Sequence, residues 1–270
     1  MLKRPGNRIW PALLLIALVG APHPEADAQE YPTQALMTWE YQNNMAWHAF
    51  NRGDYNVAEL RFNTAIKTLR KYKTSNQRLL ARSYYDLTRV LYAQKRYAEA
   101  EPLAEWVLKV RESDSQTRDD TLFDSVYLLA IIHREQGENS EAAPLLRRAL
   151  EIEERNVGPD DPRPALTLKE LADIVYRLKK YEEAEALYRR AIAVQRHYDS
   201  ELNPALAEAL EGLADVLNRL SRTAEARDAE AEARRIRDAA REAAEAAKRA
   251  AAARALRNSF KPTPVEPPAP

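Results

Sequence analysis

The sequence predicts an all-α fold, an α-solenoid of five stacked antiparallel helix pairs followed by a long C-terminal helix. Two observations support this prediction. Apolar residues recur at helical spacing, and the same pattern returns every 42 residues, as from Tyr55 to Tyr97. Only six glycines occur in 270 residues, and 30% of the residues are charged, which is typical of helices that face water on one side. A constant period indicates units that stack to share one continuous core.

Five aligned copies define the repeat, with no insertion between them. One column carries mostly tyrosine: Tyr55, Tyr97, Asn139, Tyr181 and Thr223. Two later columns carry small residues: Ala58, Ala100, Ala142, Ala184 and Ala226, then Ala65, Val107, Ala149, Ala191 and Ala233. Two adjacent earlier columns hold a large apolar residue and a small one: Met45 and Ala46, Leu87 and Thr88, Leu129 and Ala130, Leu171 and Ala172, Leu213 and Ala214. Because small residues let helices approach closely, we expect these columns to form the contact inside each pair.

The fourth copy shows both helices of one unit, in ALTLKELADIVYRLKKYEEAEALYRRAIAVQ (residues 165–195). Leu168 and Leu171 fall on one face of a first helix, and Ala184 and Leu187 fall on one face of a second. This pattern resembles the tetratricopeptide repeat, and the long period, with the phrases NVGPDDPRPALTLKELADIVY and YEEAEALYRRAI, is similar to the repeats of kinesin light chains. The resemblance covers about residues 36–236 and implies a right-handed superhelix that binds a protein or peptide partner.

Residues 1–28 differ in composition from the rest of the chain. Basic residues precede the apolar run IWPALLLIALVG, and the small-residue sequence ADA ends at Ala28. These features predict an exported bacterial protein with a secretory signal peptide cleaved after Ala28, and a periplasmic or secreted location. The apolar run is shorter than the roughly 20 residues of a membrane-spanning helix. We therefore expect no stable membrane span after cleavage, with an uncleaved anchor as the alternative.

The charge balance argues against nucleic-acid and membrane partners, and the lack of cysteine excludes disulfide bonds. Lys plus Arg number 41 and Asp plus Glu number 41, so no bulk field attracts nucleic acid or an anionic membrane surface. The chain has no cysteine, so it uses no disulfide bonds.

The resemblance implies that the first helix of each pair lines a concave wall, and that residues turned away from the partner helix contact a bound segment. These candidate partner-binding residues are Asn43, Asn44, Trp47, Phe50, Tyr85, Asp86, Arg89, Tyr92, Tyr127, Ile131, Arg134, Lys169, Asp173, Tyr176 and Arg177. The same register adds Leu128, Glu170, Glu211, Asp215, Asn218 and Arg219. The wall changes from aromatic to charged, which suits a segment with an aromatic or apolar anchor and a mixed-charge end. The alternative is that some of these aromatics only pack on the next repeat.

We predict no catalytic site, no cofactor site and no metal site. The four histidines lie far apart in sequence, and no cysteine is present to complete a zinc site. Neither a Gly-rich phosphate loop nor a nucleophile elbow occurs. His48 and His133 fall on repeat helices, where we expect packing or groove lining, with catalysis as the less favoured alternative. The protein is therefore predicted not to be an enzyme.

The C-terminal part predicts a helix that continues beyond the repeats. Four regions result: a signal peptide (1–28), a repeat domain (29–236), an Ala-rich helix (237–258) and a Pro-rich, disordered tail (259–270). Alanines at a three-four spacing, from Ala226 to Ala250, resemble a weak coiled-coil seam. The favoured function is a non-catalytic scaffold that binds a polypeptide on its concave surface in the cell envelope. The alternative is a structural protein that self-associates weakly through the Ala-rich helix.

Overall fold

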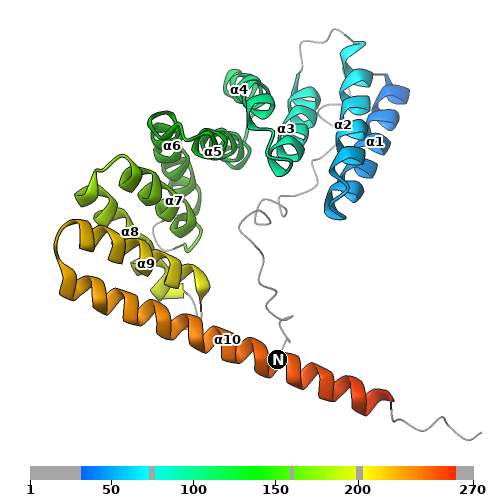
Figure 1. Cartoon of the computed structure of the whole chain (residues 1–270). Helices are drawn as coiled ribbons and strands as arrows, with labels where there is room; N and C mark the ends of the chain where they lie inside the picture. Colours follow the sequence, from blue (N-terminus) through cyan, green and yellow to red (C-terminus); the bar gives the residue numbers. More distant parts are fainter. Residues whose placement is uncertain (1–31, 73–76, 159–160, 199–202, 260–270) are drawn as a thin grey trace, which may run out of the picture. The chain divides into compact units, whose positions relative to one another are not determined.

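The computed structural model describes residues 32–72, 77–158, 161–198 and 203–259. Within these ranges the chain forms ten α-helices and no strand (Figure 1). The helices are α1 (Thr33–Asn51), α2 (Tyr55–Arg70), α3 (Arg78–Ala93), α4 (Tyr97–Ser113), α5 (Asp119–Gln136), α6 (Asn139–Val157), α7 (Pro164–Arg177), α8 (Tyr181–Tyr198), α9 (Pro204–Arg219) and α10 (Thr223–Ser259). The all-α prediction and the five helix pairs are confirmed.

The 42-residue columns correspond to fixed places in each pair. The tyrosine column supplies the first residue of every second helix, from Tyr55 in α2 to Thr223 in α10. Both later small-residue columns, from Ala58 and Ala65 onward, have no exposed surface in any copy. Since these residues are inaccessible in all five copies, the period reflects the packing of one helix of a pair on the other.

Every first helix ends in the same left-handed corner. The corner residues have φ between 60° and 83° and are Gly53, Lys95, Gly137, Lys179 and Ser221. At each corner the next backbone N–H bonds to the carbonyl five residues earlier, as from Glu138 to His133 at 2.9 Å. This Schellman arrangement satisfies the free carbonyls at the helix end and turns the chain into the second helix.

The repeats divide into two compact units, Met1–Asn156 and Val157–Pro270. In unit 1, the first helices α1, α3 and α5 form one face, which we call the inner face. Trp39 of α1 donates a hydrogen bond to Ser83 of α3 at 2.7 Å. The second helices α2, α4 and α6 form the outer face, where Arg96 donates to Glu59 at 2.6 Å. Phe62, fully buried, lies in the core of this unit.

Unit 2 comprises α7 to α10, with first helices α7 and α9 and second helices α8 and α10. Its core is aliphatic and includes Leu168, Ile174 and Leu217, each at most 1% exposed. The ring of Tyr188 in α8 packs directly on Gly212 in α9. Side-chain shape therefore fixes the contact between these two helices.

The long C-terminal helix is present. Helix α10 has 37 residues, equivalent to about 55 Å at 1.5 Å per residue. Its Ala-rich seam is buried as far as Ile236, whereas Ala243, Ala247 and Ala250 are exposed. The first part of α10 thus closes the repeat array, and the rest extends beyond it.

The predicted signal peptide and the tail from residue 260 lie outside the described residues. Among the helices that the structure does describe, none is long and apolar enough to cross a membrane.

Candidate partner-binding surface

Several residues that the register places on the inner face of unit 1 are buried. The buried ones are Asn43, Tyr85, Asp86, Arg89, Tyr92 and Ile131. Trp47, Phe50, Tyr127 and Arg134 are half-buried, and Asn44 is exposed. The physical reason is that α3 packs between α2 and α4 and also contacts α5. Trp39 and Trp47 of α1 donate hydrogen bonds to Ser83 and Asp86, so side chains of α3 are covered from several sides. The half-buried and exposed residues are the ones that remain open to a partner.

A chain of aromatic and charged groups crosses the inner face of unit 1. The guanidinium of Arg89 lies 4.5 Å from the ring centroid of Trp47 and 5.9 Å from that of Tyr85. The indole N–H of Trp47 donates to Asp86 Oδ2 at 3.3 Å. Arg89 therefore meets aromatic faces in a buried place where cation–π attraction is strong.

Arg111 of α4 supplies a second buried cation beside the same group. Its guanidinium lies 4.5 Å from the ring centroid of Tyr85 and donates to Ser125 Oγ at 2.6 Å. The Tyr85 hydroxyl is buried without a hydrogen-bond partner among the residues that the structure describes. We call Trp47, Tyr85, Asp86, Arg89, Arg111 and Asp124 the inner cluster.

The two acids of the inner cluster are hard to ionise. Burial raises the pKa of Asp86 to about 6, although Arg82, Arg89 and Arg111 oppose the increase. Burial likewise raises the pKa of Asp124 to about 6. Near neutral pH the cluster holds charges of both signs with little water around them, so its members are held in fixed positions.

Aromatic pairs border the inner cluster. Trp47 and Phe50 meet edge to face with ring centroids 5.3 Å apart. Phe123 and Tyr127 of α5 stack at 5.6 Å. These four rings are half-buried, so each keeps a packed side and an accessible side. Such rigid aromatics lose little conformational freedom when they bind a partner.

The inner face of unit 2 is more polar. The ammonium of Lys169 lies 3.2 Å from Asp173 and 3.5 Å from Glu208 of α9. Asp173 also accepts a hydrogen bond from the Tyr188 hydroxyl. Tyr176 accepts one from Arg219 at 3.2 Å, while Arg177 is exposed. The first helices of this unit therefore present paired charges.

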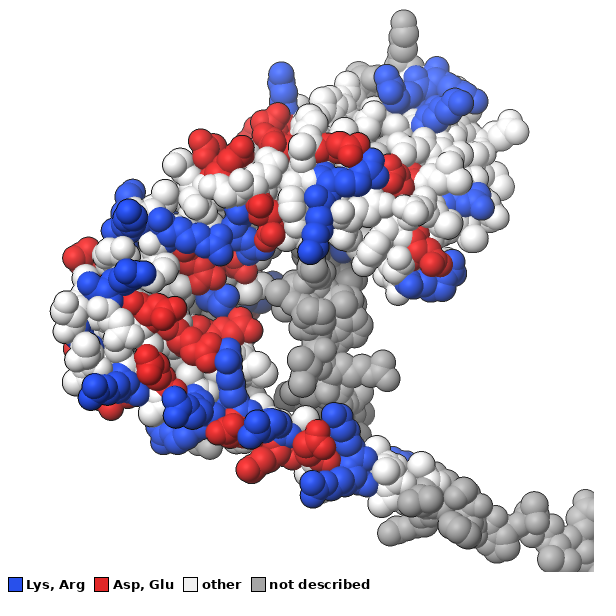
Figure 2. All heavy atoms as spheres, in the orientation of Figure 1, with Lys and Arg blue, Asp and Glu red and all other residues white. Residues whose placement is uncertain are grey.

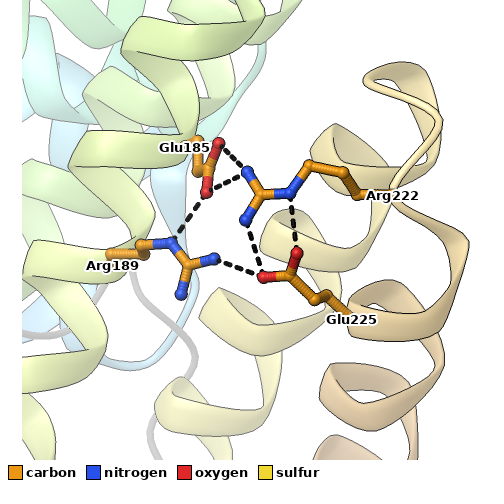
Figure 3. A network of polar contacts seen from close by, with 4 residues as sticks. All are labelled: Glu185, Arg189, Arg222 and Glu225. Carbon is orange, nitrogen blue, oxygen red and sulfur yellow. Dashed lines mark hydrogen bonds and ion pairs between the residues drawn. The ribbon is translucent and has the colours of Figure 1, made fainter.

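The outer face of unit 2 carries a four-membered ion-pair network (Figure 3). Arg222, just before α10, donates to Glu185 of α8 at 2.7 Å and to Glu225 at 2.6 Å. Arg189 donates to Glu185 at 2.8 Å and to Glu225 at 3.1 Å. The hydrogen bond from Arg222 lowers the pKa of Glu225. The network joins two consecutive second helices and closes the junction between copies four and five.

A groove of about 560 Å³ runs beside this network between α8 and α10. Its floor is apolar and includes Leu210, Leu213 and Leu217. Ion pairs cross it, at 3.1 Å from Arg189 to Glu225 and at 2.7 Å from Arg196 to Glu232. We interpret it as a stacking seam between helices, because its own side chains bridge it.

Basic and acidic side chains are interspersed over the molecular surface seen in Figure 2. This distribution agrees with the equal numbers of basic and acidic residues in the chain. Among the described residues on the face drawn in Figure 2, no extended basic stripe of the kind found on nucleic-acid-binding surfaces is present.

A histidine-carboxylate group on unit 1 was missed by the sequence analysis. Glu101, His133 and Glu138 bring three potential metal-ligand atoms within 4.8 Å of one another. The available signal was a departure from the repeat, because Glu138 occupies the column of Arg96 and Arg222. His48, by contrast, is exposed on α1.

Comparisons with known proteins agree with the repeat architecture. The tetratricopeptide repeat model matches residues 36–113, 123–197 and 165–239. Nearly identical TPR-like repeats of a kinesin light chain from Podosopora anserina are 21% identical, with 73% of this chain and 93% of that chain covered and a TM-score of 0.63. BtubC (BKLC) from P. vanneervenii is 19% identical, with 87% and 94% covered and a TM-score of 0.63.

A third similar structure has a different name, the aspartyl phosphate phosphatase F of Bacillus subtilis. It is 17% identical, with 77% of this chain and 52% of that chain covered and a TM-score of 0.60. At these identities the likeness is one of fold. No match to a curated protein was found.

Proposed function

Because this chain belongs to the tetratricopeptide repeat family, with repeats of the kinesin-light-chain type, we propose that it is a non-catalytic scaffold that binds a polypeptide segment on the inner faces of its helix pairs. The family supports the general role, since stacked helix pairs provide extended binding surfaces. The named phosphatase among the similar structures shares the fold, and activity follows from a site rather than from a fold.

One observation carries the proposal: half-buried aromatic residues border a fixed, charged cluster on the inner face of unit 1. Trp47, Phe50 and Tyr127 are each packed on one side and accessible on the other. Arg134 is also half-buried, on the same helix as Tyr127. Aromatic residues and arginine contribute most to binding where the free protein already holds them in place.

The two inner faces favour different parts of a partner. Unit 1 favours an aromatic or apolar anchor, which its accessible rings would cover. Unit 2 favours a mixed-charge segment, since Lys169, Asp173 and Arg177 present both signs. Buried candidate residues such as Arg89 do not contact the partner in this proposal. They hold the accessible side chains in position.

The test is a pair of exposed substitutions on the two faces of unit 1. Asn44→Arg places a long cation on first helix α1, and Asn63→Arg places it on second helix α2; both asparagines are exposed. Protein cross-linked in its native cells should lose its partner with Asn44→Arg and keep it with Asn63→Arg. Arg177→Glu should weaken capture through unit 2. A partner retained equally by all three variants would contradict binding on the inner faces.

We further propose that the protein works outside the cytoplasm, on the strength of the sequence of residues 1–28 alone. Cell fractionation with N-terminal sequencing of the recovered protein checks this. A chain that begins at Gln29 in the periplasm or the medium is the expected result. A cytoplasmic chain that still begins at Met1 would contradict it.

Self-association through α10 is the second candidate function. The observation that favours it is the exposed row of small residues Ala243, Ala247 and Ala250 at a three-four spacing. Because alanine buries little area, we expect a weak complex. Sedimentation analysis with and without residues 237–270 distinguishes the two: a dimer lost on truncation supports this function, and a monomer in both forms contradicts it.

A further inference from the structure

We propose that Glu101, His133 and Glu138 form a binding site for a divalent transition metal, for which zinc is the probe, on the outer face of unit 1. The site joins α4 to the corner that precedes α6. Glu101 lies on second helix α4, His133 lies near the C-terminal end of first helix α5, and Glu138 lies in the corner that follows. None of the three is among the candidate partner-binding residues.

The internal repeat is the first line of support. In copies two and five, an arginine at the residue after the left-handed corner reaches a glutamate on the preceding second helix. Arg96 meets Glu59 at 2.6 Å and Arg222 meets Glu185 at 2.7 Å. Copy three keeps the acid of α4, which is Glu101, and replaces the arginine with Glu138. Two carboxylates thus stand where the first and last junctions have an arginine beside a carboxylate.

The histidine is the second departure from the repeat. In the column of His133 the other copies carry only aliphatic residues, which are Ala49, Leu91, Val175 and Leu217. His133 is 8% exposed. Its Nδ1 lies 2.6 Å from Glu138 Oε2.

Backbone geometry holds two of the three ligands together. Gly137 has φ of 83°, and the N–H of Glu138 donates to the carbonyl of His133 at 2.9 Å. Where this corner would ordinarily bring two apolar side chains together, it pairs an imidazole with a carboxylate. The third ligand, Glu101, is oriented from α5, since Gln136 Nε2 donates to Glu101 Oε2 at 2.6 Å. Hydrogen bonds to a ligating carboxylate are the usual support of a metal site.

One imidazole nitrogen and two carboxylate oxygens are a ligand set that zinc accepts, with water at the fourth position. The three ligand atoms already lie within 4.8 Å of one another. Small rotations of the partly exposed glutamate side chains bring them to the spacing of a tetrahedral site. The metal would take the place of the arginine that Arg96 and Arg222 supply at two other junctions, as a cation at the junction of two copies.

The experiment titrates metal-free protein with zinc chloride by calorimetry and repeats the titration with His133→Ala and Glu101→Gln. We expect one zinc ion per chain, with affinity at least about tenfold lower in each variant. His48→Ala changes an exposed histidine on α1 and should bind zinc as the unmodified protein does. Absence of zinc binding, or equal binding by His133→Ala, would overturn the proposal.

A second variant separates loss of metal from loss of fold. Glu138→Arg restores the arginine of copies two and five opposite Glu101. It should fold without metal, bind no zinc, and have a Tm that zinc does not change, whereas zinc raises the Tm of the unmodified protein. A Glu138→Arg protein whose Tm still rises with zinc would place the metal elsewhere and overturn the assignment.

Discussion

The two units place their charges differently. Unit 1 keeps Asp86 and Arg89 inside, at 4% and 9% exposure, in contact with aromatic rings. Unit 2 has a mainly aliphatic core, and several of its ion pairs are exposed, as between Arg196 and Glu232, whose side chains are 53% and 32% exposed. The same repeat therefore tolerates both solutions, because its small-residue columns are shared and the remaining positions vary.

This difference predicts which substitutions lower the stability of each unit. A buried charge that loses its partner stays unsolvated, whereas an exposed charge is taken up by water. Trp39, Trp47 and Trp106 all belong to unit 1, and no tryptophan lies between residues 107 and 270. Tryptophan fluorescence thus reports on unit 1, and hydrogen exchange of α8 reports on unit 2.

The largest expected effect is that of Arg89→Ala. It removes one of the three cations that act on Asp86, together with the cation–π contact with Trp47, so we expect a loss of about 3 kcal/mol in the free energy of unfolding. Urea denaturation followed by tryptophan fluorescence measures it. Arg196→Ala in unit 2 is the matched control, because it removes only an exposed ion pair. Hydrogen exchange of the α8 amides should show that the free energy of opening falls by less than about 1 kcal/mol. Equal losses would remove the distinction between the units.

Gly212→Ala tests the interior of unit 2. An added Cβ would lie 2.4 Å from Cε1 and Cζ of Tyr188, whose hydroxyl is held by Asp173. We expect overpacking to cost about 1–3 kcal/mol, seen as faster hydrogen exchange in α8. Adding Tyr188→Leu should recover part of the loss. A single variant that is more stable, as helix propensity alone would predict, would show that Tyr188 moves freely.

Acidification should stabilise unit 1. Burial raises the pKa of Asp86 and Asp124 from 3.8 to about 6, so between those values the folded state holds more protons than the unfolded state. The free energy of unfolding therefore falls as pH rises through this window, and lowering the pH from 7 to 5 should add about 1 kcal/mol for each carboxyl. Urea denaturation at both pH values, followed by fluorescence, measures it. The double variant Asp86→Asn, Asp124→Asn should lose this dependence, and an unchanged profile would assign it to other groups.

The smallest expected effect concerns the corners. Lys179 has φ of 62°, a backbone conformation that is unfavourable for a residue with a Cβ. Lys179→Gly should therefore raise the free energy of unfolding of unit 2 by about 0.5–1 kcal/mol. Gly53→Ala is the reciprocal change in unit 1 and should lower the free energy of unfolding by about 1 kcal/mol. An added Cβ meets no atom within 4 Å, so this loss comes from the backbone conformation alone. Denaturation by urea measures both. If both substitutions raised, or both lowered, the free energy of unfolding, the two corners would not share one geometry.

The fold could be predicted from the sequence because its determinants repeat. The tyrosine column marks the start of every second helix, and Ala58 and Ala184 are equally buried three repeats apart. The partner-binding residues were harder to predict from the sequence. The repeat register gives the direction of a side chain, but it does not show which neighbouring side chains cover it. Tyr85 and Tyr92 lie on the predicted face, but neighbouring helices bury them. Whether the accessible residues bind a partner stays a prediction.

The histidine-carboxylate group was missed for a different reason. Ligand spacing along the chain gives no signal, because His133 is separated from Glu101 by most of α4 and α5. Comparison between copies gives one, since His133 stands alone in a column of aliphatic residues and Glu138 shares its junction with the acid Glu101. In a repeat protein, the exception to a column is as informative as the column.

The five identical corners have a consequence for how the array can grow. Because every copy begins and ends at the same backbone geometry, a 42-residue segment can be duplicated or deleted between corners without designing a new turn. The residue after the corner then decides which copies match: Arg96 and Arg222 each pair with a glutamate of the preceding second helix, whereas Lys180 stands in the register of Ala143. A copy inserted at the first or last junction would thus have to supply the matching charge.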